Sequence, residues 1–161
     1  MSREKIEYSR PPTVEDLVNL CRSLNDEGVQ YIVIGGLAII AQGFTRATED
    51  IDLLIKDDLK NHQKLIKVLS KLPDGAASEL SPADISEFEV IRVADEFVVD
   101  LMTRACGEKF EGNQHLIEKK IIEGVSIPFA SSELLLKLKQ GVRPKDKMDR
   151  DFLEKKLLKK N

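Results

Sequence analysis

Residues 31–55 constrain the fold more than any other part of this 161-residue sequence. They run YIVIGGLAIIAQGFTRATEDIDLLI, in which an apolar run ends in two glycines and a second apolar run begins with two aspartates. The β-branched residues in both runs favour buried strands, and the intervening LAIIAQ is typical of a short helix. This order predicts a sheet with a helix between two strands, and it places Asp50 and Asp52 in a segment that is otherwise buried.

Further helices and strands are predicted on both sides of this segment. Thr13 can cap a helix whose apolar residues recur at helical spacing as far as Gly28. Residues 56–72 predict another helix, which a turn at residues 73–75 closes. The small and polar residues 76–86 predict a loop.

The later part of the chain predicts strands followed by helices. Residues 87–93 and 97–102 predict a hairpin around the turn pair Asp95 and Glu96. Two further segments follow at 117–124 and 125–129. The tail from residue 131 is predicted to be helical twice, with a break at 141–144. The pair of segments fits two short strands, or a strand and a helix end.

These elements together predict an α/β (α+β) fold. We expect a short, twisted, mixed sheet with helices packed on one face, the acidic residues on the exposed face, and a C-terminal helical segment. A chain of this length can bury one core. The sequence therefore predicts a single domain over residues 1–161, with its core at 13–130 and a basic helical segment at 131–161.

Composition and charge argue against several classes of protein. The first residues carry no signal-peptide core, and no apolar run reaches the roughly eighteen residues of a membrane span, so we expect a cytoplasmic protein.

Cys21 and Cys106 lack the spacing of a zinc site or disulfide framework, and we expect both to be at least half-buried. We expect His62 and His115 at the surface. The net charge of -3 argues against wholesale nucleic-acid binding, although residues 133–161 hold ten Lys or Arg against five Asp or Glu.

The two aspartates of the second strand pose an electrostatic problem. Residues two apart in a strand project from one face, so the Asp50 and Asp52 carboxylates repel each other unless a cation lies between them. A hard divalent cation with oxygen ligands, Mg²⁺ or Mn²⁺, is the usual solution. Asp100 is a lone carboxylate in the apolar run VVDLM, and an adjacent strand would lie about 5 Å away. The three carboxylates could hold two ions about 3.5 to 4 Å apart, an arrangement used for phosphoryl displacement.

Each of these features also has a purely structural explanation. An Asp-x-Asp in a strand usually marks a polar face that meets water, and a lone strand aspartate is no more specific. A glycine pair after a strand is often plain turn chemistry, although Gly35 and Gly36 would also let a phosphate approach backbone N–H groups at a helix N-terminus. The combination of the glycine pair with three carboxylates favours a site that handles phosphates.

In combination, these motifs resemble the nucleotidyltransferase superfamily that includes DNA polymerase beta. The shared pattern is Ile34-Gly35-Gly36, then Asp50-Ile51-Asp52-Leu53, then Asp100. The segment is similar more narrowly to the minimal and abortive-infection toxin type, in which a Gly, an Arg and a Thr precede the aspartates as Gly43, Arg46 and Thr48 do here. The tail LLLKLKQGVRPKDKMDRDFL resembles the helical segment of the same group, and the resemblance covers most of residues 28–155.

The resemblance implies a nucleotidyltransferase fold and a set of site residues. It implies that Asp50 and Asp52 bind the metal ions that hold a nucleoside triphosphate, and that Asp100 binds the second metal and helps to activate the attacking hydroxyl as a general base or through metal-bound water. The further residues that it places at the nucleotide or acceptor are Gly35, Gly36, Arg46, Thr48, Lys139, Arg143 and Lys145. Arg46 fits a solvated loop residue equally well, and a basic helix end is also ordinary helix-dipole chemistry.

The implied function is transfer of a nucleoside monophosphate from a triphosphate such as ATP to a hydroxyl of RNA, a protein or a small molecule, with release of pyrophosphate. Larger members carry a second domain that recognises the acceptor, and this chain has only about thirty residues left for one. We therefore expect acceptor choice to come from a homodimer, an antitoxin or other partner protein, or the basic tail. The alternatives are a catalytically silent nucleotide-binding or regulatory module and a structural domain whose aspartates face water. The intact set of three carboxylates argues against both.

Overall fold

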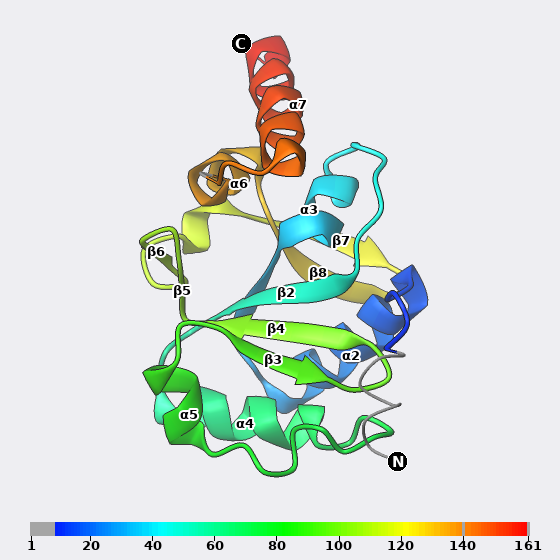
Figure 1. Cartoon of the computed structure of the whole chain (residues 1–161), viewed down its shortest axis with the longest axis vertical. Coiled ribbons are helices and arrows are strands. Elements are labelled where there is room, and N and C mark those ends of the chain that lie inside the picture. The colour runs from blue at the N-terminus through cyan, green and yellow to red at the C-terminus, as the bar shows by residue number, and fades with distance from the viewer. Residues whose placement is uncertain (1–8, 140, 161) are drawn as a thin grey trace.

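A six-stranded mixed sheet forms the centre of the computed structural model, which describes residues 9–139 and 141–160 (Figure 1). Its strands are β1 (Tyr31–Ile34), β2 (Asp50–Ile55), β3 (Ile91–Ala94), β4 (Val98–Met102), β7 (Ile117–Ile122) and β8 (Val125–Ala130). They lie in the order β3-β4-β2-β1-β8-β7. The neighbours β1 and β8, and likewise β2 and β4, are parallel, whereas the other neighbours are antiparallel.

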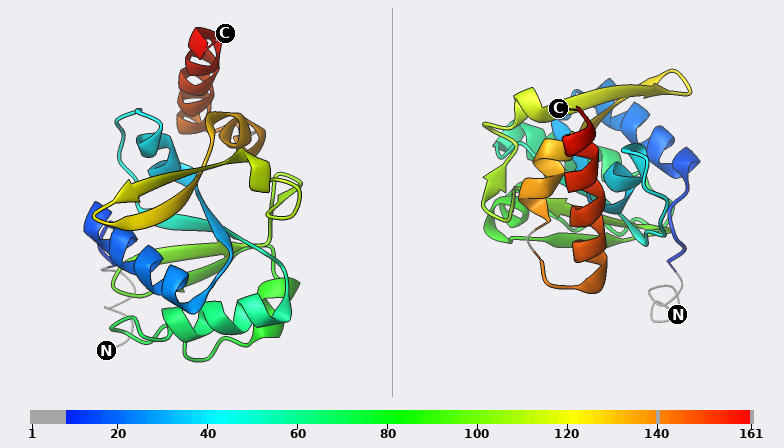
Figure 2. Two further views of the ribbon diagram at one scale, coloured as in Figure 1. Left: turned by 180° about the vertical axis from the view of Figure 1, so that it is seen from behind. Right: turned by 90° about the horizontal axis from the view of Figure 1, so that it is seen from above.

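The helices lie behind the sheet and at its two ends, and a small hairpin lies beside it (Figures 1 and 2). The helices are α2 (Val14–Glu27), α3 (Gly35–Ala41), α4 (Leu59–Leu69), α5 (Pro82–Glu87), α6 (Ser132–Leu138) and α7 (Pro144–Lys160), with a 3-10 turn η1 (Gln114–Leu116), and the hairpin is β5 (Arg104–Ala105) and β6 (Glu108–Lys109). Figures 1 and 2 show α2 behind the sheet, α4 and α5 at one end, and α7 extending from the other end. The predicted α/β fold with a mixed sheet and a C-terminal helical segment is confirmed.

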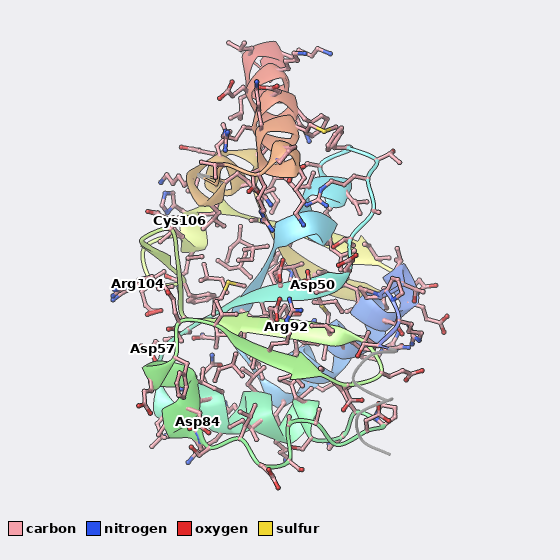
Figure 3. All side chains as sticks on the ribbon, in the orientation of Figure 1. Asp50, Asp57, Asp84, Arg92, Arg104 and Cys106 are labelled. Atoms are coloured by element: carbon pink, nitrogen blue, oxygen red, sulfur yellow. The ribbon has the colours of Figure 1, made fainter. Side chains whose placement is uncertain are left out.

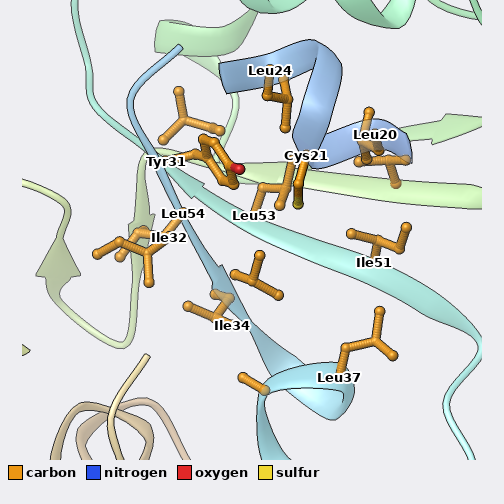
Figure 4. Close-up of a cluster of buried hydrophobic side chains, with 14 of the residues drawn as sticks. Leu20, Cys21, Leu24, Tyr31, Ile32, Ile34, Leu37, Ile51, Leu53 and Leu54 are labelled. Atoms are coloured by element: carbon orange, nitrogen blue, oxygen red, sulfur yellow. The ribbon is translucent and has the colours of Figure 1, made fainter. Parts of the chain in front are cut away.

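The first helix begins and ends where its sequence predicts. The Thr13 hydroxyl accepts a hydrogen bond from the Asp16 amide, and the Asp16 carboxylate accepts one from the Thr13 amide, which forms a capping box. Gly28 ends the helix at φ 79°, a left-handed conformation that glycine adopts without a steric penalty. Figure 4 shows Leu20, Cys21 and Leu24 of this helix gathered with Ile51 and Leu53 of β2, so the face of β2 opposite its aspartates is closed by the core.

Three predictions from the sequence are wrong. They concern the loop at residues 76–86 and the burial of His62 and Cys106. The loop predicted at 76–86 contains α5, which begins because Ser81 and Asp84 form a capping box with Pro82 in the first turn. His62 is 1% exposed and therefore not a surface residue, because α4 places it on its buried face. Cys106 is exposed rather than half-buried, because it lies in the turn between β5 and β6.

Two predictions about the later chain can be made definite. Residues 117–122 and 125–130 are both strands, so the alternative of two short strands is confirmed there and the alternative of a strand and a helix end is wrong. His115 lies at the surface, as predicted. Within the described part of the chain, none of the helices combines the length and the apolar character that crossing a membrane requires.

Candidate active site

Three carboxylates meet on one face of the sheet, at the middle strands. The parallel register of β2 and β4 sets Asp52 directly opposite Asp100, and Asp50 lies two residues along β2 on the same face. One carboxylate oxygen from each of the three residues lies within 4.8 Å of the others. Asp100 is buried and the other two are half-buried. The structure therefore brings together the three aspartates that the sequence singled out.

The negative charges in this cluster are held together at an electrostatic cost. Burial, and then repulsion from Asp50 and Asp100, raise the pKa of Asp52 from 3.8 to about 7. Burial and the charge of Asp100 also raise the pKa of Asp50. Oxygen ligands concentrated in this way, with surplus negative charge, are the donor set that a hard divalent cation such as Mg²⁺ or Mn²⁺ prefers. The residues present therefore fit the metal that the sequence implies.

Arg92 belongs to this cluster, and the sequence did not predict it. The antiparallel register of β3 and β4 sets Arg92 opposite Asp100. Its Nε donates to Asp100 Oδ1 at 3.0 Å, and its Nη2 donates to Asp100 Oδ2 at 3.0 Å and to Asp50 Oδ2 at 3.3 Å. Figure 3 shows Arg92 beside Asp50 on the sheet. One guanidinium thus partly neutralises two of the three carboxylates.

Steric crowding explains why the start of α3 needs two glycines. A Cβ on Gly35 would lie 1.9 Å from Asp52 Oδ2, and a Cβ on Gly36 would lie 2.5 Å from Thr48 Oγ1. Gly35 also has φ +71°, which side chains rarely adopt. The two glycines therefore let the side chains of Asp52 and Thr48 lie directly against the backbone where β1 passes into α3.

Gly35→Ala is expected to lower the unfolding midpoint and to displace Asp52. A matched control is Gly75→Ala, because Gly75 also has positive φ (+63°) but a Cβ added there would meet no atom within 4 Å. The control should lose about 1 to 2 kcal/mol from backbone strain alone. The Gly35 variant should lose more, and it should also lose Mn²⁺ binding measured by titration. Equal midpoints for the two variants would show that the Asp52 carboxylate moves aside without cost.

All ten residues that the sequence predicted for the site line one cavity of about 590 Å³. They are Gly35, Gly36, Arg46, Thr48, Asp50, Asp52, Asp100, Lys139, Arg143 and Lys145. The carboxylates come from the sheet, whereas the last three cations come from the end of α6, the linker after it and the first turn of α7. The cavity thus has both anionic and cationic groups in its wall.

Three cations of this wall, Arg46, Lys139 and Arg143, pair with two buried aspartates that the sequence did not predict. Asp149 is 0% exposed, and it lies 3.1 Å from Arg46 Nε and 3.2 Å from Lys139 Nζ. Asp146 accepts hydrogen bonds from Arg143 Nε at 2.9 Å and Nη2 at 3.1 Å, which lowers the pKa of its carboxyl. Because residues three apart share a helix face, the spacing of these aspartates was a usable signal. They tie α7 to the loop before β2 and to the end of α6.

Comparison with known proteins identifies the family of this chain. The sequence profile described as aminoglycoside-2''-adenylyltransferase matches residues 16–153, which is most of the chain. The protein belongs to that adenylyltransferase family. It is therefore a member of the nucleotidyltransferase superfamily, and the resemblance drawn from its motifs is confirmed. No curated protein sequence matches this nucleotidyltransferase significantly.

Solved structures agree with the nucleotidyltransferase fold. TM1012 of Thermotoga maritima, provisionally named a nucleotidyltransferase, superposes with a TM-score of 0.57 at 17% identity, over 92% of this chain and 93% of its own. The lincosamide antibiotic adenylyltransferase LnuA, solved with lincomycin bound, superposes with a TM-score of 0.61 at 16% identity, over 90% of this chain and 98% of its own. At these identities the likeness shows that the fold of this nucleotidyltransferase is shared.

Proposed function

We propose that this protein is a metal-dependent nucleotidyltransferase that transfers a nucleoside monophosphate from a triphosphate to a hydroxyl and releases pyrophosphate. The observation that carries this proposal is the set of three aspartates whose oxygens lie within 4.8 Å of one another at the wall of a cavity with cations. Family membership supports nucleotidyl transfer in general.

The three aspartates have distinct roles in this reaction. Asp50 and Asp52 would hold divalent ions together with the triphosphate, and Asp100 would hold the second ion and accept the proton of the attacking hydroxyl. When bound, Mg²⁺ or Mn²⁺ would neutralise the phosphate charge and make the attacking hydroxyl of the acceptor easier to deprotonate. A bond forms between the acceptor oxygen and the α-phosphorus, the bond from the α-phosphorus to the bridging oxygen breaks, and pyrophosphate leaves.

The cationic wall and the glycine pair would bind the nucleotide. Arg46 and Lys139 pair with the buried Asp149, and Arg143 pairs with the buried Asp146, so these ion pairs would orient the three cations before a phosphate binds. Thr48 lies against Gly36, and its hydroxyl donates to the Asp50 carbonyl at 3.2 Å, which holds the chain just before the metal ligands. The site is therefore largely preorganised.

A direct assay tests the proposal. The protein is incubated with each labelled triphosphate, ATP first because the family is named for adenylyl transfer, with and without Mg²⁺. The acceptors are an aminoglycoside, a lincosamide, total RNA and cell-lysate protein, since the family and LnuA are named for antibiotics of the first two classes. We expect Mg²⁺-dependent pyrophosphate release with label on one acceptor class. Mg²⁺-dependent binding of a triphosphate without pyrophosphate release would support the silent-module alternative, and absence of binding would support a structural domain.

Lys145→Gln is expected to weaken triphosphate binding about twofold to fivefold, the effect of one exposed ion pair. Lys145 lies in the cavity wall in the first turn of α7. Lys147→Gln is the matched control, because Lys147 is exposed on the same helix outside the cavity wall. The difference between the variants, measured by calorimetric titration, should shrink as salt rises. Equal losses in both would mean that only the overall charge of the tail matters.

A further inference from the structure

Arg92 already contacts three of the six carboxylate oxygens that a divalent cation could bind at this cluster. It donates to both oxygens of Asp100 and to one oxygen of Asp50, and no hydrogen bond links it to Asp52 among the described contacts. A guanidinium and a divalent ion that share the same carboxylates repel each other across a few ångströms. Metal binding therefore has to weaken or break the contacts of Arg92.

The position of Arg92 in the sheet makes this exchange easy. Its strand, β3, is an edge strand that pairs only with β4 in the six-stranded sheet. The Arg92 side chain is 61% exposed, whereas the Asp100 side chain that it contacts is 9% exposed. The guanidinium can therefore leave the carboxylates for water or for a ligand in the cavity that it also lines, without opening the core.

We propose that Arg92 is an internal counter-cation that competes with the metal ion for Asp50 and Asp100, and that it couples metal binding to nucleotide binding. Without nucleotide, Arg92 holds the cluster together and lowers its affinity for metal. With a triphosphate in the cavity, the guanidinium pairs with phosphate oxygens instead, because arginine binds phosphates in the same forked geometry as carboxylates. The metal ligands are then released at the moment when the substrate arrives. Arg92 therefore contacts the carboxylates before the triphosphate binds and the phosphates afterwards, and the inference rests on the proposed function.

The test is direct Mn²⁺ binding, measured by electron paramagnetic resonance, with and without a non-hydrolysable triphosphate. Arg92→Met removes the charge and keeps most of the apolar stem. Arg104→Met is the matched control, because Arg104 is exposed on β5, in the separate two-stranded sheet, and lies outside the cavity wall. Figure 3 shows that Arg104 lies away from Asp50. Arg92→Lys keeps the charge without the fork and should give intermediate values.

Arg92→Met should bind Mn²⁺ alone about threefold to tenfold more tightly than the wild type, and the triphosphate should increase that affinity less than it does for the wild type. Its unfolding midpoint should fall in EDTA and recover with Mn²⁺, because the cluster has lost its counter-charge. Arg104→Met should match the wild type throughout. Equal or weaker Mn²⁺ binding by Arg92→Met would overturn the inference and leave the proposed function standing. If the wild type bound no Mn²⁺ with or without triphosphate, the proposed function itself would fail.

Discussion

Asp52→Asn is expected to reduce nucleotidyl transfer by at least about 100-fold, since loss of even an outer-shell metal partner costs up to that much. The same change should raise the unfolding midpoint of the metal-free protein by about 3 °C or more, which corresponds to roughly 1 kcal/mol at this chain length. Both effects have one cause, because the charge that repels Asp50 and Asp100 is also the charge that would hold the metal.

The gain in stability should depend on pH with a definite sign. The pKa of Asp52 is raised from 3.8 to about 7 in the folded protein, so its protonated form stabilises the fold. That contribution is fully present below about pH 4 and is lost as the pH rises through 7. Asparagine carries no charge at any of these pH values. The advantage of the variant should therefore be largest near pH 8 and shrink toward pH 5.

Thermal unfolding in EDTA at pH 8 and pH 5 measures this difference. Asp16→Asn is the control, because a hydrogen bond from Arg10 lowers the pKa of Asp16 to about 2 and its ionised form stabilises the fold. That variant should melt lower than the wild type at pH 8 and keep full transfer activity. Mn²⁺ with triphosphate should raise the midpoint of the wild type but not that of Asp52→Asn. If Asp52→Asn melted lower without metal and gained as much from ligand as the wild type, Asp52 would be a structural residue.

Asp149→Ala is expected to destabilise the fold by about 3 to 5 kcal/mol, the usual cost of removing one partner from a buried ion pair. The substitution leaves Arg46 and Lys139, whose side chains are only 15% and 11% exposed, without their shared carboxylate. It also removes the contact that ties α7 to the loop before β2. We therefore expect triphosphate binding to fall together with stability.

Asp151→Ala is the control for this change, because Asp151 is exposed two residues along the same helix. Its midpoint should stay near that of the wild type, whereas the Asp149 variant should melt roughly 6 to 20 °C lower at 2 to 4 °C per kcal/mol. Indistinguishable midpoints for the two variants would mean that water screens the Asp149 pairs despite their burial.

The acidic cluster could be predicted from the sequence because it depends on local periodicity. Asp50 and Asp52 alternate with Ile51 and Leu53, and alternation fixes which side chains share a face regardless of the neighbouring strands. Asp100 needed one further assumption, that its strand lies beside β2, and the parallel register confirms it.

Arg92 was missed because its place depends on a one-residue detail of the hairpin. A two-residue turn of Asp95 and Glu96 would pair Ala94 with Phe97 and therefore Arg92 with Val99, on the opposite face from Asp100. The structure pairs Ala94 with Val98, and this shift brings Arg92 opposite Asp100. Asp95 is buried and accepts hydrogen bonds from the Asp74 and Ala76 amides, which fixes the longer loop. These partners are distant in sequence, so local pattern could not reveal them.

The order of the strands sets how readily each part of the site opens to solvent. The strand with Asp50 and Asp52 is hydrogen-bonded on both sides, and so is the strand with Asp100, whereas the strand with Arg92 is bonded on one side only. Backbone amides of central strands exchange with deuterium only when a large unit unfolds, while edge amides exchange through local fraying. Slow exchange around the three aspartates and fast exchange around Arg92 would mean that the strands with the aspartates stay closed while the strand with Arg92 opens many times between unfolding events.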